Sequence, residues 1–326
     1  MLDMKSEYFS DSEIVGFLSD GVEDDNQTIK DFLNSLLSLY EISQDGKPLS
    51  YALIKDWPIF VDEKSLSIVL DMLGSLFQPN DPVRYIAEYR DYLQAWDDVK
   101  TEMKTNTRFF CQMDSIVDIF NEFNIDSDSL ILFKNEKFFR ARVHHKEEPT
   151  FSIDEMGAPK TPELATPGRA NPNGIRYLYL CYDNKTPFYE VRPYYLDRVD
   201  IGEFLIQEDN LKIVDFTEKV NLFNVFYDEG EIVFKQKVKR RVLFDAISND
   251  LSKPLRSFDS ELEYVPTQYI CEFFKCRGAD GIKFKSSVRD AGKNLVLFYP
   301  NKAKCVRVYP YEVSKITINQ IHLKKL

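Results

Sequence analysis

The spacing of apolar residues changes near Ser129, and this change most constrains the fold. Across residues 28–123, apolar side chains recur three and four positions apart, which is the period of an amphipathic helix. The segments with this period are 28–40, 63–77, 82–104 and 113–123. After the change, short apolar runs alternate with turn residues, as strands do. The sequence therefore predicts an α+β protein, all-helical over 1–130 and β-rich over 131–326.

The second part divides into elements by the same reasoning. Strands are expected at 131–144 (as a hairpin or two short strands around Asn135), 176–183, 186–193, 212–216, 281–286, 294–299 and 305–309. Helices are expected at 238–249 and 264–276. Residues 149–174 are rich in Pro and Gly, which predicts a long shaped loop.

Charge is distributed unevenly along the chain. Residues 1–130 contain 10 Lys and Arg against 26 Asp and Glu, whereas the remainder contains 32 against 27. The acidic part is a poor candidate for binding nucleic acid or an anionic membrane. The mildly basic part has the charge to hold an anionic ligand.

Composition also restricts the compartment and the chemistry. The five cysteines include no CxxC pair, which favours reduced thiols in a cytoplasmic protein over disulfides or a zinc site. The longest apolar runs fall short of the roughly eighteen residues that a membrane span needs, and the acidic N-terminus is unlike a signal peptide. Only three histidines are present, so most catalytic sites that are built around histidine would lack the residues they need. We expect neither a metal nor a permanently bound cofactor.

Arginines in two segments are candidates for binding an anion. Arg140 and Arg142 stand two apart on an expected strand, so they share a face. Two guanidinium groups on one face can grip a diphosphate through forked hydrogen bonds. The alternative is a pair of solvated strand arginines. The Gly/Pro/Asn-bounded turn at 168–174 presents a third candidate, Arg169, directly before an aromatic strand.

Tyrosine and glutamate side chains follow that turn. Tyr177 and Tyr179 share one strand face, and a tyrosine can stack on a heterocycle while its hydroxyl orients a ribose. Ordinary strand packing is the alternative, with at least one of the pair in the core. Glu190 lies in the expected strand 186–193. Cleaving an N-glycosidic bond to a cationic leaving group needs negative charge near the sugar and no acid, so one carboxylate suffices. The alternative is an exposed strand glutamate.

Two adjacent serines end the expected strand 281–286. Neither Ser286 nor Ser287 has an obvious histidine or lysine partner in the sequence, so a nucleophilic serine is disfavoured. A hydroxyl that donates a hydrogen bond to a ligand or to the glutamate fits better.

Taken together, these segments resemble the RES domain, a family named for its Arg, Glu and Ser. The segments that carry the resemblance are, in order, FFRARV, MGAP, ATPGRANPNGIRYLYL, TPFYEVRP, YVPTQ, DGIKFKSS and GKNLVLF. Residues 1–130, with Trp96 and the stretch Lys104–Phe110, resemble the helical HEPN-like segment that often precedes RES domains.

This resemblance implies a fold, a substrate and a site. RES proteins are toxins of bacterial toxin–antitoxin pairs, with a fold like that of ADP-ribosyltransferases, and they consume NAD by hydrolysis or phosphorolysis at the nicotinamide–ribose bond. The implied catalytic residues are Arg140, Arg169, Tyr179, Glu190 and Ser286. The implied NAD-contacting residues are Arg142, Asn171, Tyr177 and Ser287. Which tyrosine and which serine line the site stays open.

The same resemblance leaves other functions and partners open. The chain could instead transfer ADP-ribose to a macromolecule, or bind a nucleotide without consuming it while its acidic part engages a partner. A HEPN-type ribonuclease is disfavoured, because residues 1–130 contain no histidine. The expected partners are NAD, phosphate, a protein antitoxin or regulator, and a second copy of the chain.

Overall fold

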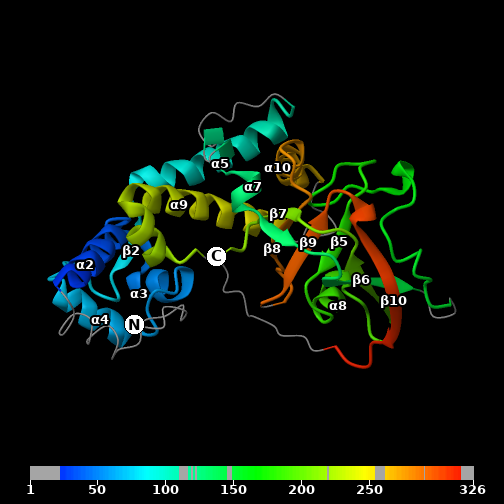
Figure 1. The fold of residues 1–326 in the computed structure, drawn as a ribbon, viewed down its shortest axis with the longest axis horizontal. Helices are drawn as coiled ribbons and strands as arrows, with labels where there is room; N and C mark the ends of the chain where they lie inside the picture. The colour runs from blue at the N-terminus through cyan, green and yellow to red at the C-terminus, as the bar shows by residue number, and fades with distance from the viewer. Residues whose placement is uncertain are drawn as a thin grey trace, which may run out of the picture. The chain divides into compact units, whose positions relative to one another are not determined.

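The computed structural model divides the chain into two compact units. It describes residues 23–109, 117–118, 120–121, 123–144, 149–218, 220–253, 261–289 and 291–316, with side chains from residue 27 onward. The first unit falls within Met1–Trp96 and Lys219–Leu243, and the second within Asp97–Glu218 and Phe244–Leu326. These units do not follow the expected boundary near residue 130. A helix-rich first part and a large mixed sheet confirm the α+β class (Figure 1).

The first unit packs helices around an aromatic core. Its elements are α2 (Glu23–Leu37), β1 (Tyr40–Pro48), α3 (Leu49–Tyr51), a π-helical turn (Ala52–Asp56), α4 (Glu63–Met72), β2 (Pro82–Tyr85), the start of α5 (Ala87–Thr105) and the start of α9 (Leu222–Ser252). The apolar stripe of α2 lies in this core, where Phe32 contacts the rings of Phe223, Phe226 and Phe234. Gly230, at φ 84°, kinks α9.

The expectation of an all-helical first part is wrong. Strands β1 and β2 pair antiparallel, and β2 occupies the start of the segment expected to be a helix from 82 to 104. A side chain on Gly46 would approach the backbone of Val83 within 2.5 Å, so glycine lets the strands come together. The apolar residues of β2 run directly into those of α5, which hid the change of period. The expected helix 113–123 lies mostly outside the described residues.

One sheet organises the second unit. Its strands are β3 (Leu130–Leu132), β4 (Lys137–His144), β5 (Leu178–Cys181), β6 (Arg198–Ile206), β7 (Leu211–Asp215), β8 (Gly281–Lys285), β9 (Lys293–Leu297) and β10 (Ala303–Glu312). Their order in the described sheet is β10-β6-β4-β5-β9-β8-β7-β3, and only the β7–β8 pairing is parallel (Figure 1). The helices of this unit are α7 (Ile125–Asp128), α8 (Thr186–Val191), α10 (Val265–Cys276) and the later parts of α5 and α9.

The segment expected to be a strand at 186–193 is a helix, α8, and this corrects the local structure around Glu190. Asp183 starts the helix, because its carboxylate accepts the backbone N–H groups of Lys185 and Thr186 at 2.8 and 2.9 Å. The chain leaves the helix at Arg192, which adopts a left-handed conformation at φ 46°. Strand β6 was not expected at all, since Asp200, Gly202 and Glu203 interrupt its apolar pattern.

Alternation along β4 separates two sets of side chains. Phe138 packs in the core with Met156 and Leu180, whereas Phe139 and Ala141 pack on the opposite face with residues of α8. Arg140 is in phase with Phe138 and therefore starts from the face opposite α8. Strands β4 and β5 pair at a single register position, Phe139 with Cys181, so they separate beyond it on the side of Arg140.

Candidate functional site

A fixed carboxylate forms the centre of the site. Glu190 Oε1 accepts hydrogen bonds from Ser286 Oγ at 2.8 Å and from Asn294 Nδ2 at 2.7 Å. Glu190 Oε2 lies 3.9 Å from Arg169 Nη1, which is an ion-pair distance and too long for a hydrogen bond. The Glu190 side chain is 22% exposed and that of Arg169 is 16% exposed. One oxygen is therefore held by two neutral donors, while the other faces a cation in a partly open position.

Further residues hold this carboxylate and its helix, and sequence reasoning missed them. Asn294 is oriented by the Cys181 thiol, whose Sγ lies 3.2 Å from Asn294 Oδ1 across the β5–β9 pairing. Arg289 Nη1 donates to Asp183 Oδ2 at 2.7 Å and to Thr186 Oγ1 at 2.8 Å, which ties the start of α8 to the β8–β9 connection. The amide of Asn294 within the apolar run NLVLF was the one available signal.

The loop that presents Arg169 is held from within by Asn171. The Asn171 amide nitrogen donates to the backbone oxygens of Thr166, Pro172 and Ile175 at 3.0, 3.2 and 3.0 Å. Asn171 is buried and its amide is used inside the loop, so it shapes the site and does not face a ligand.

Tyr179 fixes the same loop through its hydroxyl. That hydroxyl donates to Asn171 Oδ1 at 2.7 Å and accepts the Ala170 backbone N–H at 3.0 Å. Burial raises the pKa of Tyr179 above its ordinary value, so the phenol stays protonated. With the hydroxyl engaged in the loop, only the partly exposed ring remains to contact a ligand.

Two arginine side chains donate hydrogen bonds to the backbone of residues 155–157. Arg140 Nη1 donates to Gly157 O at 2.7 Å, and Arg142 Nη1 donates to Glu155 O. Arg142 also lies 4.6 Å above the ring of Phe151. Among the described residues, neither arginine forms an ion pair with a carboxylate. Hydrogen bonds from Ser152 lower the pKa of Glu155, and the Arg142 charge lowers it further, so one carboxylate lies within electrostatic range of the pair. The two guanidinium groups still concentrate positive charge on one strand.

The electrostatics connect the arginine pair to the loop. Burial lowers the pKa of Arg140 to about 10, the charge of Arg142 lowers it as well, and Tyr179 opposes the shift. The Arg169 charge in turn acts to lower the pKa of Tyr179. Tyr179 thus lies within electrostatic range of both Arg140 and Arg169, where β4 and β5 separate. No described contact joins Arg140 to Glu190 directly.

Comparison with known proteins identifies this arrangement. A sequence model of the RES domain matches residues 137–318, which includes all of the site residues above. The chain belongs to the RES domain family. A solved structure, the M. tuberculosis MbcT–MbcA toxin–antitoxin complex, is 14% identical, with a TM-score of 0.32 over 57% of this chain and 89% of that chain. No curated protein matches the chain. Family membership supports, in general terms, an NAD-consuming enzyme of the toxin class.

The structure places the two members of each open pair differently. Ser286 contacts Glu190, whereas Ser287 is exposed. Tyr177 is 3% exposed and packs against Phe298 at 4.9 Å, so it is a core residue and no ligand contact. Tyr179 is the tyrosine that lies beside the site.

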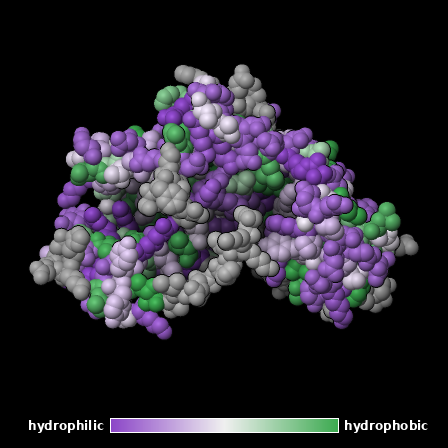
Figure 2. Space-filling model, turned by 180° about the vertical axis from the view of Figure 1, so that it is seen from behind, coloured by the Kyte–Doolittle hydropathy of each residue, from purple (hydrophilic) through white to green (hydrophobic). Residues whose placement is uncertain are grey.

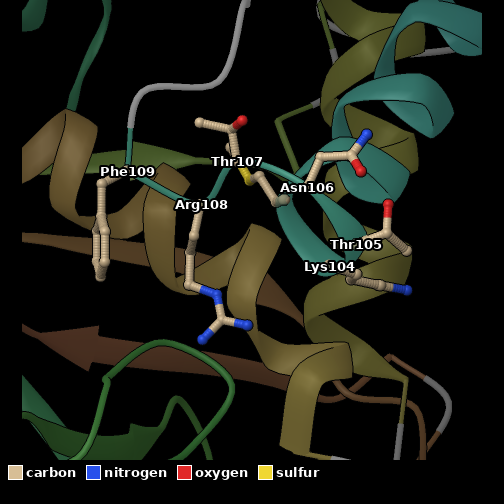
Figure 3. Close-up of a pocket in the computed structure, with 7 residues that line it drawn as sticks. Lys104, Thr105, Asn106, Thr107, Arg108 and Phe109 are labelled. Atoms are coloured by element: carbon tan, nitrogen blue, oxygen red, sulfur yellow. The ribbon is translucent and has the colours of Figure 1, made fainter.

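Other features of the described residues fall outside this site. A cavity of about 410 Å³ is lined by Met103, Lys104, Thr105, Asn106, Thr107, Arg108 and Phe109, all at or beyond the end of α5 (Figure 3). No site residue lines it. In the described part of the chain, no cluster of metal-ligating side chains and no helix long and apolar enough to cross a membrane is found. Apolar residues on the face in Figure 2 lie in small separate groups.

Proposed function

We propose that the protein degrades NAD by cleaving the bond between nicotinamide and ribose, with water or phosphate as the acceptor. The observation that carries this proposal is the carboxylate of Glu190, which Ser286 and Asn294 hold through one oxygen while the other stays beside Arg169. Such a carboxylate supplies fixed negative charge where a sugar cation develops, without the need for a second acid.

The proposed reaction needs no group beyond NAD, the acceptor and the Glu190 carboxylate. The C1′–N bond of NAD breaks and its electron pair leaves with nicotinamide, which becomes neutral. Glu190 Oε2 stabilises the positive charge that develops on the ribose and accepts a hydrogen bond from a ribose hydroxyl. An oxygen of water or phosphate then forms the new bond to C1′. When water attacks, its proton passes to solvent, and the product is ADP-ribose; when phosphate attacks, the product is the 1′-phosphate of ADP-ribose.

The arginines bind and orient the substrate in this proposal. Arg140, Arg142 and Arg169 bring guanidinium groups to the region where β4 and β5 separate, and the first two donate to backbone oxygens without a described ion pair. Their free N–H groups suit the diphosphate of a dinucleotide. Tyr179 lies within electrostatic range of Arg140 and Arg169, and in this proposal its ring contacts the nicotinamide riboside. Correct placement of the substrate contributes several kcal/mol to such reactions.

Release of nicotinamide from NAD tests the proposal directly. Purified protein, freed of any bound inhibitor, is incubated with NAD with and without phosphate, and nicotinamide is separated and quantified. Glu190→Gln should reduce the rate about a hundredfold or more, as the loss of one such electrostatic group typically does. Glu272→Gln, an exposed carboxylate on α10, is the matched control and should match the parent. A parent protein that releases no nicotinamide, or a Glu190→Gln variant as active as the parent, contradicts the proposal.

The biological setting proposed here follows from the family. We propose that the enzyme acts in the cytoplasm and is restrained by a protein antitoxin or regulator, as the resemblance to RES toxins implies. With adenylate-labelled NAD, label that stays in small molecules supports degradation of NAD. Label that becomes attached to protein or nucleic acid would instead establish transfer of ADP-ribose.

A further inference from the structure

The loop that presents Arg169, residues 168–174, is called the arginine loop below. The first turn of α10 contacts its backbone at three points. Thr267 Oγ1 lies 2.6 Å from Arg169 O, and Gln268 Nε2 lies 2.8 Å from Gly168 O and 3.0 Å from Asn171 O. Each contact is a hydrogen bond from a side chain to a backbone oxygen, so it depends on the identity of the α10 residue and only on the backbone of the loop. About a hundred positions of sequence separate the two segments.

The environment of these donors indicates a specific role. Thr267 is 2% exposed, and its hydroxyl also lies 3.0 Å from the backbone oxygen of Tyr264, the residue that directly precedes α10. A buried threonine in a helix usually satisfies its hydroxyl on its own backbone. Here the shorter contact goes to Arg169 O, in a different segment. Gln268 likewise divides its amide protons between two oxygens of the same loop, which leaves no donor for the solvent.

Few polar contacts hold the Arg169 side chain. Its one described polar side-chain contact is the 3.9 Å ion pair to Glu190, and ion pairs at that distance restrain orientation weakly. The direction of the guanidinium group therefore depends on its backbone. Tyr179 and Asn171 hold the loop on one side, and Thr267 and Gln268 hold it on the other.

We propose that Thr267 and Gln268 are positioning residues that set the place of the Arg169 guanidinium relative to Glu190 and to the substrate diphosphate. This inference rests on the proposed NAD-degrading function and adds to it the residues that hold Arg169 where it can bind the substrate. Loss of either donor lets the Arg169 backbone shift, and a displacement of about 1 Å at a group that orients the substrate can cost up to about a hundredfold in rate.

A double-mutant cycle separates positioning from a merely structural role. Thr267→Val removes the hydroxyl at nearly constant volume, Gln268→Met removes both amide donors, and Thr267→Ser keeps a hydroxyl. We expect kcat/KM for NAD to fall about tenfold in Thr267→Val and Gln268→Met, and to be largely restored in Thr267→Ser. In an Arg169→Ala background, the Thr267→Val and Gln268→Met substitutions should cause no further loss, because residues that act through one group are not additive. Glu272→Gln on the same helix is the control and should behave as the parent.

The same double-mutant cycle can be measured through NAD binding, in a protein that does not consume NAD. NAD affinity is measured by calorimetry on the Glu190→Gln protein, with and without Thr267→Val, and again with Arg169→Ala added. We expect Thr267→Val to weaken NAD binding only where Arg169 is present. Parental kcat/KM in both Thr267→Val and Gln268→Met, or an equal loss in the Arg169→Ala background, overturns the inference. A parent protein that neither binds nor consumes NAD refutes the proposed function instead, so the two failures are distinguishable.

Discussion

Gly168 lies where the arginine loop has no room for a side chain. A Cβ atom there would stand 2.7 Å from Tyr179 Oη and 2.7 Å from Asn171 Oδ1, two atoms that are hydrogen-bonded to each other. Neither can move away at low cost, because the Tyr179 hydroxyl also accepts from Ala170 and the Asn171 amide donates to three backbone oxygens. Gly168→Ala therefore forces the loop to break some of its own hydrogen bonds.

The expected cost follows from these contacts. Losing the Tyr179–Asn171 and Ala170–Tyr179 hydrogen bonds costs about 1 kcal/mol each, and forcing an extra methyl group into a packed site adds roughly 1–3 kcal/mol. Some of the strain relaxes, so we expect the free energy of unfolding to fall by about 2–4 kcal/mol. For a domain of this size, that is a drop in thermal midpoint of roughly 5–15 °C. NAD turnover should fall as well, because Arg169 is the next residue.

Thermal unfolding followed by circular dichroism measures the effect. Gly157→Ala is the matched control, since its nearest neighbour would be Asp154 O at an ordinary 3.7 Å, and its midpoint should stay within a few degrees of the parent. Tyr179→Phe removes the clashing oxygen, so the Gly168→Ala/Tyr179→Phe variant should lose less than the sum of the single variants. A Gly168→Ala midpoint equal to that of the parent, or strict additivity, would refute the reasoning.

Three further predictions concern the site and its sheet. Ser286→Ala should slow nicotinamide release about tenfold, because the site carboxylate loses one of its two donors, whereas Ser287→Ala should match the parent. Arg140→Met should abolish NAD binding in calorimetry yet raise the thermal midpoint by a few degrees. Burial lowers the pKa of Arg140 to about 10, so its charge opposes folding at neutral pH, and this destabilisation is lost only as the pH rises through that value. A midpoint below that of the parent contradicts this. Lys283→Met should cost about 3–5 kcal/mol in urea unfolding, because Lys283 Nζ lies 2.6 Å from Asp215 Oδ2 and both side chains are nearly buried; an unchanged free energy of unfolding would show that the Asp215 charge needs no partner.

The sequence singled out Glu190 but predicted the wrong local structure around it. The segment TPFYEV has the β-branched and aromatic residues of a strand, and alternation alone cannot show that Asp183 caps it as a helix. The difference matters, because a strand would fix the face of the sheet on which Glu190 lies, whereas α8 brings Glu190 to Ser286 and Asn294. Those partners lie 96 and 104 positions away, beyond what a local pattern reports.

The roles of single residues were equally hidden in the sequence. Tyr179 and Asn171 stand in a segment that resembles a ligand-binding loop, yet their polar atoms hold the loop itself. Thr267 and Gln268 gave no chemical signal, since neither titrates nor carries charge, and their function depends on which backbone oxygens the fold brings near them. The arginines were identifiable because Arg140 and Arg142 stand two apart on an expected strand and Arg169 stands in a Gly/Pro/Asn-bounded turn.

The charge balance of the site argues for a dinucleotide over smaller ligands. Arg169 pairs with the one site carboxylate, Glu190, whereas Arg140 and Arg142 donate to backbone oxygens and form no ion pair among the described residues. The three guanidinium groups therefore leave an excess of positive charge. The diphosphate of NAD carries two negative charges, so its binding neutralises the excess, whereas nicotinamide riboside cannot. The attraction acts partly through solvent and is screened by salt. NAD affinity should therefore fall as ionic strength rises and should exceed that for nicotinamide riboside at every salt concentration. Equal affinity for the two ligands would show that the arginines do not bind the diphosphate.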